Sequence, residues 1–156
     1  NSIKELQPYI LEAMDFDLRP FMGESFYIDL YEKFVASPSL DGYEDLFNGS
    51  TYTYNGNKYQ HEGIRAVLVY HAFARYSGNA NIKSTPYGMV QKTTQYSDRV
   101  SEATTARLMS QARSGAMVHE GRVMDFLNRN KEDYPLFTCK GGGKKYRAGK
   151  IIKKIG

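Results

Sequence analysis

The sequence predicts a mainly α-helical fold: a bundle of about four helices, a β-hairpin insertion at about residues 50–60, and an extended C-terminal arm. Apolar residues recur at helical spacing over four stretches. An Asn-Gly pair lies between two runs of β-branched and aromatic residues, which is typical of a hairpin. The last 19 residues hold seven basic side chains and no acidic ones. We therefore expect a helical domain at residues 1–137 and a basic arm at residues 138–156, in a chain long enough to bury about two-thirds of its surface.

Two helices are expected at the N-terminus. Ser2 and Glu5 form a capping box, which predicts that a short helix starts there and runs to Met14. The pattern is expected to break at residues 15–17. A second helix then begins near Asp17, with Asp17 as its cap and Pro20 in its first turn. Its apolar stripe comprises Leu18, Phe21, Met22, Phe26, Leu30, Tyr31 and Phe34.

A short helical piece and a hairpin follow. The helical piece spans Tyr43 to Phe47, and the hairpin spans Ser50 to Gln60 around Asn55-Gly56, because a type I′ turn needs positive φ at both central residues. A two-stranded hairpin is marginally stable alone, so we expect it to pack on a neighbour. Its exposed aromatic side chains are Tyr52, Tyr54 and Tyr59.

Two longer helices complete the domain. The stretch from Glu62 to Ser77 is so apolar that we expect it at the centre of the fold. The longest helix is predicted from Glu102 to Asn130, with Ser101 as its cap. Residues 82–100 between them predict a long ordered loop with one or two short strands. Core positions on the longest helix are predicted at Ala103, Ala106, Leu108, Met109, Ala112, Ala116, Val123, Met124 and Leu127.

No catalytic, cofactor-binding or metal-binding residues are predicted, and we expect a protein that is not an enzyme. His61, His71 and His119 have no partner at metal-ligand spacing. His71 is interpreted as a hydrogen-bonded core residue, and the other two as surface residues. No nucleophile elbow is present, and the glycine run at 141–143 lacks Walker A spacing. The acidic pairs are interpreted as helix caps or solvated groups: Asp15/Asp17, Glu44/Asp45 and Glu132/Asp133.

Composition narrows the function classes further. The single cysteine, Cys139, excludes an intramolecular disulfide framework and favours a protein assembled in the cytosol. Residues 1–137 hold 14 basic and 17 acidic side chains, a net charge of −3, which argues against a nucleic-acid-binding fold with a basic face. No apolar run approaches the ~20 residues of a membrane helix.

The basic arm has three interpretations. It is a solvated extension, or a phosphate-binding arm, or a strand that docks on the sheet edge of another protein. Phosphate contacts would come from Lys140, Lys144, Lys145 and Arg147. The docking strand is favoured because Ile151, Ile152 and Ile155 add nothing to an electrostatic arm.

Several short motifs resemble those of a known protein family. They are Asp17–Gly23, Tyr27–Leu30, Val69–Tyr76 and the stretch from Asn81 to Lys92, followed by Tyr96-Ser97. Across residues 3–130 they resemble head-tail connector (adaptor) proteins of tailed phages. The likeness is closest to the neck-ring proteins of crAss-like phages that infect Bacteroidetes.

The resemblance implies a structural virion protein of the neck, between capsid and tail, assembled in the host cytoplasm. Such proteins form a homo-oligomeric ring, typically of twelve subunits, under the portal protein. The ring extends the channel through which DNA passes without specific contacts, and it docks the next neck or tail protein. No cofactor and no membrane partner are implied. The arm would grip the portal through Lys150, Ile151, Ile152, Lys153, Lys154 and Ile155.

Contacts with other subunits or neck proteins are expected from the hairpin, from the loop at 82–100 and from the small-residue helix at 102–130. The candidate contact residues are Tyr52, Tyr54, Tyr59, Tyr87 and Met89. The alternative is a small nucleic-acid-binding accessory protein that acts through its basic tail.

Overall fold

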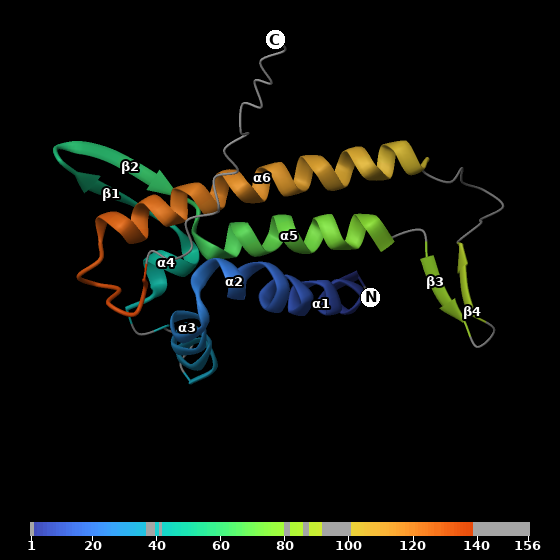
Figure 1. The fold of residues 1–156 in the computed structure, drawn as a ribbon, viewed down its shortest axis with the longest axis horizontal. Helices are drawn as coiled ribbons and strands as arrows, with labels where there is room; N and C mark the ends of the chain where they lie inside the picture. Colours follow the sequence, from blue (N-terminus) through green and yellow to red (C-terminus); the bar gives the residue numbers. More distant parts are fainter. Residues whose placement is uncertain are drawn as a thin grey trace, which may run out of the picture.

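The computed structural model describes residues 2–36, 40, 42–79, 82–85, 88–91 and 101–138. The fold is mainly helical, as predicted, and its frame is a pair of long helices that lie side by side, α5 (Gly63–Asn79) and α6 (Glu102–Arg129) (Figure 1). α1 (Ser2–Ala13) packs on α5. No helix among the described residues has both the length and the apolar character that a bilayer crossing requires.

The α-helical pattern is interrupted at residues 15–17, as predicted, although the chain stays helical through the interruption. α1 continues into a π-helix, η1 (Met14–Leu18), and then into α2 (Arg19–Met22). The amide of Arg19 donates to the carbonyl of Met14, five residues earlier. Pro20 lies in the first turn of α2, and a proline ring clashes with the carbonyl four residues before it in an α-helix. The wider π turn accommodates that ring, and Asp17 lies inside this turn instead of capping a helix.

The expected second helix is likewise divided, by Gly23. The backbone of Gly23 has a φ of 83°, which a residue with a Cβ adopts at a cost, and α3 (Glu24–Ala36) starts after it in a new direction (Figure 1). Helix propensity favours a continuous helix on both sides of Gly23. The chain changes direction because α3 must place Phe26 and Leu30 in the core.

The short helix and the hairpin are confirmed. α4 (Glu44–Asn48) precedes the antiparallel strands β1 (Ser50–Tyr54) and β2 (Asn57–His61). Asn55 and Gly56 have φ values of 49° and 78°, as a type I′ turn requires. Tyr52 is paired with Tyr59 across the strands.

The two long helices begin and end close to the predicted residues. The Ser101 hydroxyl accepts from the amide of Thr104 at 3.2 Å and caps α6, as predicted. The backbone between the helices forms a second antiparallel hairpin, β3 (Ile82–Thr85) with β4 (Gly88–Gln91), beyond the ends of α5 and α6 (Figure 1).

The predicted core of α6 is correct only in part. Ala112, Ala116, Val123 and Leu127 are buried, whereas Ala103 and Ala106 are exposed. Met109 packs beside Gly78, the penultimate residue of α5. The first turns of α6 therefore extend past the end of α5, and none of the described helices covers them.

The main core lies where the N-terminal helices, the first hairpin and the C-terminal part of α6 meet. Its last member, Phe137, is 6% exposed and directly precedes the predicted arm, of which residues 139–156 lie outside the described part of the chain. The core comprises Leu18, Met22, Phe26, Leu30, Leu40, Tyr43, Leu46, Ile64, Val67, Val123, Phe126, Leu127, Tyr134 and Phe137.

Candidate functional site: an apolar pocket on the N-terminal helices

An apolar pocket of about 310 Å³ opens between the N-terminal helical run, α3, α4 and α5. Its size is at the lower end of the ~300–1,000 Å³ of ordinary binding pockets. Arg65 is the one charged residue in its lining. The lining residues are Ile10, Met14, Leu18, Tyr27, Leu30, Tyr31, Phe34, Phe47, Ile64, Arg65, Leu68 and Val69.

Large hydrophobic side chains stay exposed along the pocket rim. Tyr31, Phe34 and Val69 are 48%, 50% and 60% exposed. Single exposed apolar residues are ordinary, but their concentration around one opening marks a surface that gains from being covered. Tyr31 and Phe34 were predicted on one apolar stripe with Leu30. In the structure Leu30 is buried at the pocket floor, while these two residues form its rim.

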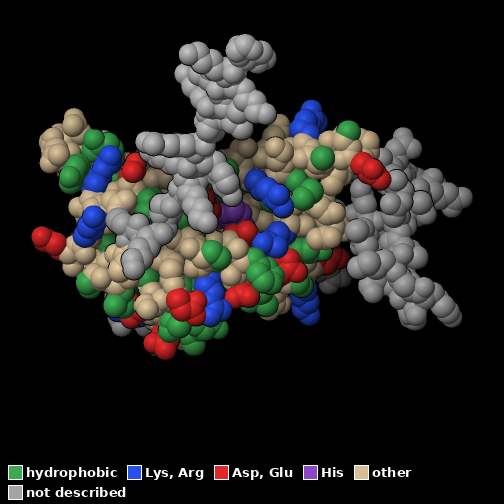
Figure 2. Space-filling view, in the orientation of Figure 1, with side chains coloured by type: hydrophobic (Ala, Val, Ile, Leu, Met, Phe, Trp, Pro, Cys, Tyr) green, Lys and Arg blue, Asp and Glu red, His purple; other side chains and the backbone are tan. Residues whose placement is uncertain are grey.

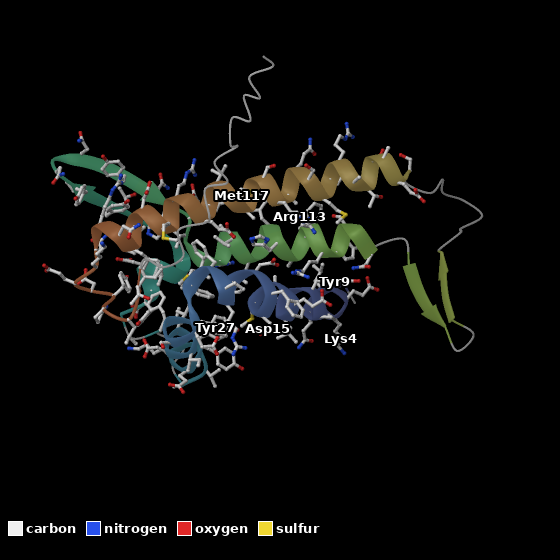
Figure 3. All side chains as sticks on the ribbon, viewed as in Figure 1. Lys4, Tyr9, Asp15, Tyr27, Arg113 and Met117 are labelled. Carbon is white, nitrogen blue, oxygen red and sulfur yellow. The ribbon has the colours of Figure 1, made fainter. Side chains whose placement is uncertain are left out.

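Arginine and carboxylate side chains surround one side of the pocket. Arg19 donates to Asp15 at 2.9 Å and also bonds Glu24, which raises the pKa of Arg19 and lowers that of Glu24. Tyr27, on the pocket wall, has its pKa raised by burial and by the nearby Asp15 carboxylate. Figure 3 shows Asp15 and Tyr27 where η1 and α3 approach each other.

The N-terminal third of the chain is strongly acidic. Residues 2–48 hold three basic and ten acidic side chains, a net charge of −7. In Figure 2, acidic, basic and hydrophobic side chains lie next to one another over the region of α1 to α3. At the pocket itself the charges are more balanced: Arg65 is the one charged lining residue, and Asp15 and Glu24 are paired with Arg19.

A second, polar cleft of about 390 Å³ lies between η1, α5 and α6. His71 Nε2 is 2.7 Å from Glu120 Oε1, and His71 Nδ1 is 3.7 Å from Asp17 Oδ2. Arg75 donates to both oxygens of Asp17, at 2.8 and 3.1 Å. His71 is hydrogen-bonded, as predicted, but it is only partly buried at this cleft and does not belong to the main core.

The groups of the polar cleft are used in joining helices. Asp17 links η1 to α5 through Arg75, and Glu120 links α6 to α5 through His71. Asp17 is therefore neither a cap nor a solvated group, which corrects the interpretation of that acidic pair. Figure 3 shows Arg113 and Met117 of α6 at this cleft. No arrangement of nucleophile, base and orienting group is present there among the described side chains.

The other two histidines are not surface residues, so that prediction is wrong for both. His61 is 1% exposed, stacks on Phe126 with ring centroids 4.1 Å apart, and has its Nε2 3.2 Å from Ser50 Oγ. Burial lowers the pKa of His61. His119 Nδ1 lies 3.0 Å from a Glu62 oxygen. The register of the hairpin places Ser50 opposite His61, whereas Glu62 and His119 are too far apart in the sequence for a local pattern to pair them.

Glu62 joins the start of α5 to α6. It accepts from Arg122 at 2.6 Å as well as pairing with His119. Partial burial tends to raise the pKa of Glu62, but the hydrogen bonds from Arg122 and His119 outweigh it and lower the pKa. The Arg122–Glu62 ion pair is partly exposed, so it contributes little to the free energy of unfolding.

The tyrosines of the first hairpin pack on α6 of the same chain. Tyr52 stacks on Tyr59 at 5.7 Å and meets Phe126 edge-on at 5.1 Å. The guanidinium of Arg129 lies 3.8 Å from the Tyr59 ring centre and donates to the Tyr52 hydroxyl at 3.0 Å. The hairpin was expected to pack on a neighbour, and that neighbour is α6. Among the three tyrosines, Tyr54 has the most exposed surface, at 40%.

The remaining predicted contact residues lie outside the described part. Met89 falls in β4, where only the backbone is described, and Tyr87 is not described. The same holds for Cys139, for the phosphate candidates Lys140, Lys144, Lys145 and Arg147, and for the docking segment 150–155. Within the described residues, no group of three histidine, cysteine or acidic side chains could hold a metal ion.

The apolar pocket was not predicted from the sequence. A signal was present: α5 and α3 carry more apolar residues than one face can bury, including Val69, Phe73 and Val35, which are all exposed. On α5, the many apolar residues were interpreted as evidence that this helix lies at the centre of the fold.

The chain was compared with known proteins in three ways. A family model described as a family of unknown function, DUF6712, matches residues 18–147. No curated protein and no solved structure matches the chain.

Proposed function

The chain belongs to DUF6712, a family of unknown function, and we propose that it is a structural virion protein that forms a head-tail connector ring of twelve subunits under the portal. The observation that carries the proposal is the exposed apolar pocket on acidic helices, with no catalytic group in its lining. Such a surface supports assembly with another polypeptide, because covering it removes apolar area from water.

A closed ring needs two different surfaces on each subunit, since a heterologous contact repeats by rotation. The pocket face provides one candidate surface. The hairpin end of α6, with Tyr54 and Arg129, provides a second, chemically different one. In the proposed ring, the next neck or tail protein docks below, and DNA passes through the channel without specific contacts.

In this proposal the arm docks on a sheet edge of the portal. Ile151, Ile152 and Ile155 supply apolar contacts, and the lysines between them keep the segment soluble before docking. The neighbouring cations, such as Lys144 and Arg147, are placed to meet phosphates of the DNA as it passes.

Portal binding by three variants tests the arm. Deletion of residues 138–156 should abolish binding of the chain to purified portal. A variant with Ile151, Ile152 and Ile155 changed to serine keeps the charge of +7 and should also fail to bind. A matched variant with Lys140, Lys144 and Lys145 changed to glutamine should retain binding. Full binding by the serine variant would contradict docking through the isoleucines.

The location of the chain in intact particles tests the ring. Electron microscopy of the virion should show it in the neck, directly under the portal, with the symmetry of a twelve-subunit ring. Density in the capsid shell or tail fibre, or absence from the particle, would overturn the proposal.

The charge of the arm favours one other function, a small nucleic-acid-binding accessory protein. Seven cations predict binding to duplex DNA whose log K falls against log salt with a slope of up to about −6. The body alone, residues 1–137, should not bind. If full-length protein binds DNA in this manner but neither portal nor particle, the accessory function is the correct one.

A further inference from the structure

We infer that the apolar pocket on the N-terminal helices binds the C-terminal segment of the same chain, residues 149–156, through Ile151, Ile152 and Ile155. This inference goes beyond the proposed function, because it concerns the free chain and does not require a ring or a portal. It gives the pocket an occupant and gives the isoleucines a place in the molecule before assembly.

The pocket needs an apolar occupant. Its lining is apolar apart from Arg65, and the rim residues Phe34 and Val69 are at least half exposed. Branched aliphatic side chains fit such a lining without leaving a polar group unpaired. The last eight residues of the chain hold three such side chains, Ile151, Ile152 and Ile155.

The described chain ends close to the pocket. Phe137 packs against Phe26 of α3, with ring centroids 5.5 Å apart. Leu30, one turn further along α3, lines the pocket. The 12 residues between Thr138 and Ile151 can span up to about 40 Å when extended, which is ample for this path.

Attachment to the same chain favours an intramolecular contact. A short flexible link holds its end at an effective concentration of the order of millimolar. A second copy of the chain at micromolar concentration cannot compete with that for the same pocket. The first occupant of the pocket in dilute solution is therefore the segment of its own chain.

Charge complementarity favours the same occupant. Residues 2–48 have a net charge of −7, and residues 138–156 have a net charge of +7. Arg19 and Arg65 lie near the pocket, but Arg19 is already paired with Asp15 and Glu24. The opposite net charges of the two segments attract each other over a longer range, while the isoleucines supply the contact with the apolar lining.

Paramagnetic broadening in NMR spectra tests the contact in the full chain. A variant with Cys139→Ser and Gly156→Cys carries a nitroxide label at its end, on isotope-labelled protein. Methyl signals of Met14, Leu68 and Val69 should broaden, and those of Val118 on α6 should not. In a mixed sample, one protein carries the nitroxide but no isotope label, and the other carries the isotope label but no nitroxide. No broadening should appear in this sample.

Matched variants separate apolar seating from charge attraction. Val69→Glu, at the 60% exposed rim, should abolish the broadening, whereas Val118→Glu, at a 54% exposed site outside the lining, should not change it. Serine at positions 151, 152 and 155 should also abolish it. Serine at positions 141, 142 and 143 changes three residues of the same tail and should leave it intact.

Each alternative result overturns the inference. Broadening in the mixed sample assigns the pocket to the segment of a second copy. Broadening that survives both Val69→Glu and the isoleucine substitutions shows attachment by charge alone. No broadening at the pocket shows that the segment does not bind there, and this outcome leaves portal binding under the proposed function to be decided by its own test.

Discussion

At the scale of single residues, two glycines of α6 have opposite surroundings. A Cβ at Gly115 would lie 2.5 Å from Cε1 of Tyr70 on α5, whereas a Cβ at Gly121 would meet no atom within 4 Å. Gly115 lets the Tyr70 ring lie against the α6 backbone, beside His119. Gly121 has no such role, so its cost to the helix is not offset by packing.

Gly121→Ala should raise the free energy of unfolding by about 1 kcal/mol, because alanine loses less conformational entropy in a helix. Gly115→Ala gains the same amount but forces Tyr70 to move, and overpacking typically costs about 1–3 kcal/mol. We expect Gly115→Ala to be the less stable of the two in urea denaturation. Equal stabilisation by both would show that Tyr70 moves freely.

His61 is a second residue whose role depends on its surroundings. It is the last residue of β2 and packs on α6, and its Nδ1 has no hydrogen-bond partner in the described structure. Burial lowers its pKa from the usual 6.5, although the carboxylates of Asp45 and Glu62 act in the opposite direction. The native state therefore holds this imidazole neutral at pH values at which the unfolded chain binds a proton.

The stability of the wild-type protein should fall as the pH falls below about 6.5, since protons then bind the unfolded chain in preference. Each pKa unit of lowering corresponds to about 1.4 kcal/mol. His61→Phe should flatten this part of the profile. Urea denaturation between pH 8 and 5 gives the free energy of unfolding of the wild type and of His61→Phe. His71 and His119 are present in both proteins, so the difference between the two profiles reports on His61. Parallel profiles would contradict a neutral His61.

At the scale of elements, the hairpin is held to α6 by one aromatic cluster. Phe126 lies under both Tyr52 and His61, and Arg129 covers the outer side of Tyr59. Since an isolated hairpin is marginal in water, this cluster decides whether β1 and β2 stay paired.

Arg129→Ala should make amide hydrogen exchange in residues 51–60 several-fold faster, because the ring contact and the bond to Tyr52 are both lost. Arg129→Lys should be intermediate, since an ammonium keeps the charge but not the planar stacking. The control is Arg113→Ala on the same helix, which should leave hairpin exchange unchanged. Equal exchange in all three variants would show that the arginine does not hold the hairpin.

The elements differed in how far the sequence predicted them. The first hairpin, the Ser101 cap and the long helices follow from local rules, and each was predicted within a few residues. The π turn at residues 14–18 and the change of direction at Gly23 were not predicted. Both depend on where Pro20 and Phe26 must lie in three dimensions, and helical periodicity alone does not contain that information.

At the scale of the whole molecule, the charge of the chain changes just after the last core residue of the described part. That residue is Phe137, and the basic arm begins at the next residue, with its first cation at Lys140. Tyr134 and Phe137 both contact Phe26, so the segment after α6 is part of the folded body.

A chain that ends at residue 137 should keep the folded core, and in urea its free energy of unfolding should fall only by the amount that binding of residues 149–156 in the apolar pocket contributes. A chain that ends at Asp133 loses Tyr134 and Phe137 from the core and should be less stable by at least about 3 kcal/mol, the usual cost of removing a buried aromatic ring. If both truncations were equally stable, these two rings would contribute nothing to the core.

The sequence by itself determined the helical class, the hairpin and the separation of a basic tail from an acidic body. These properties depend on residues close together in the chain, where turn chemistry, capping and net charge act locally. Only the tertiary structure decided which apolar residues stay exposed and which polar residues are buried. Tyr31, Phe34 and Val69 form a pocket rim, and His61 lies in the core, because their neighbours come from distant elements whose packing no local pattern specifies.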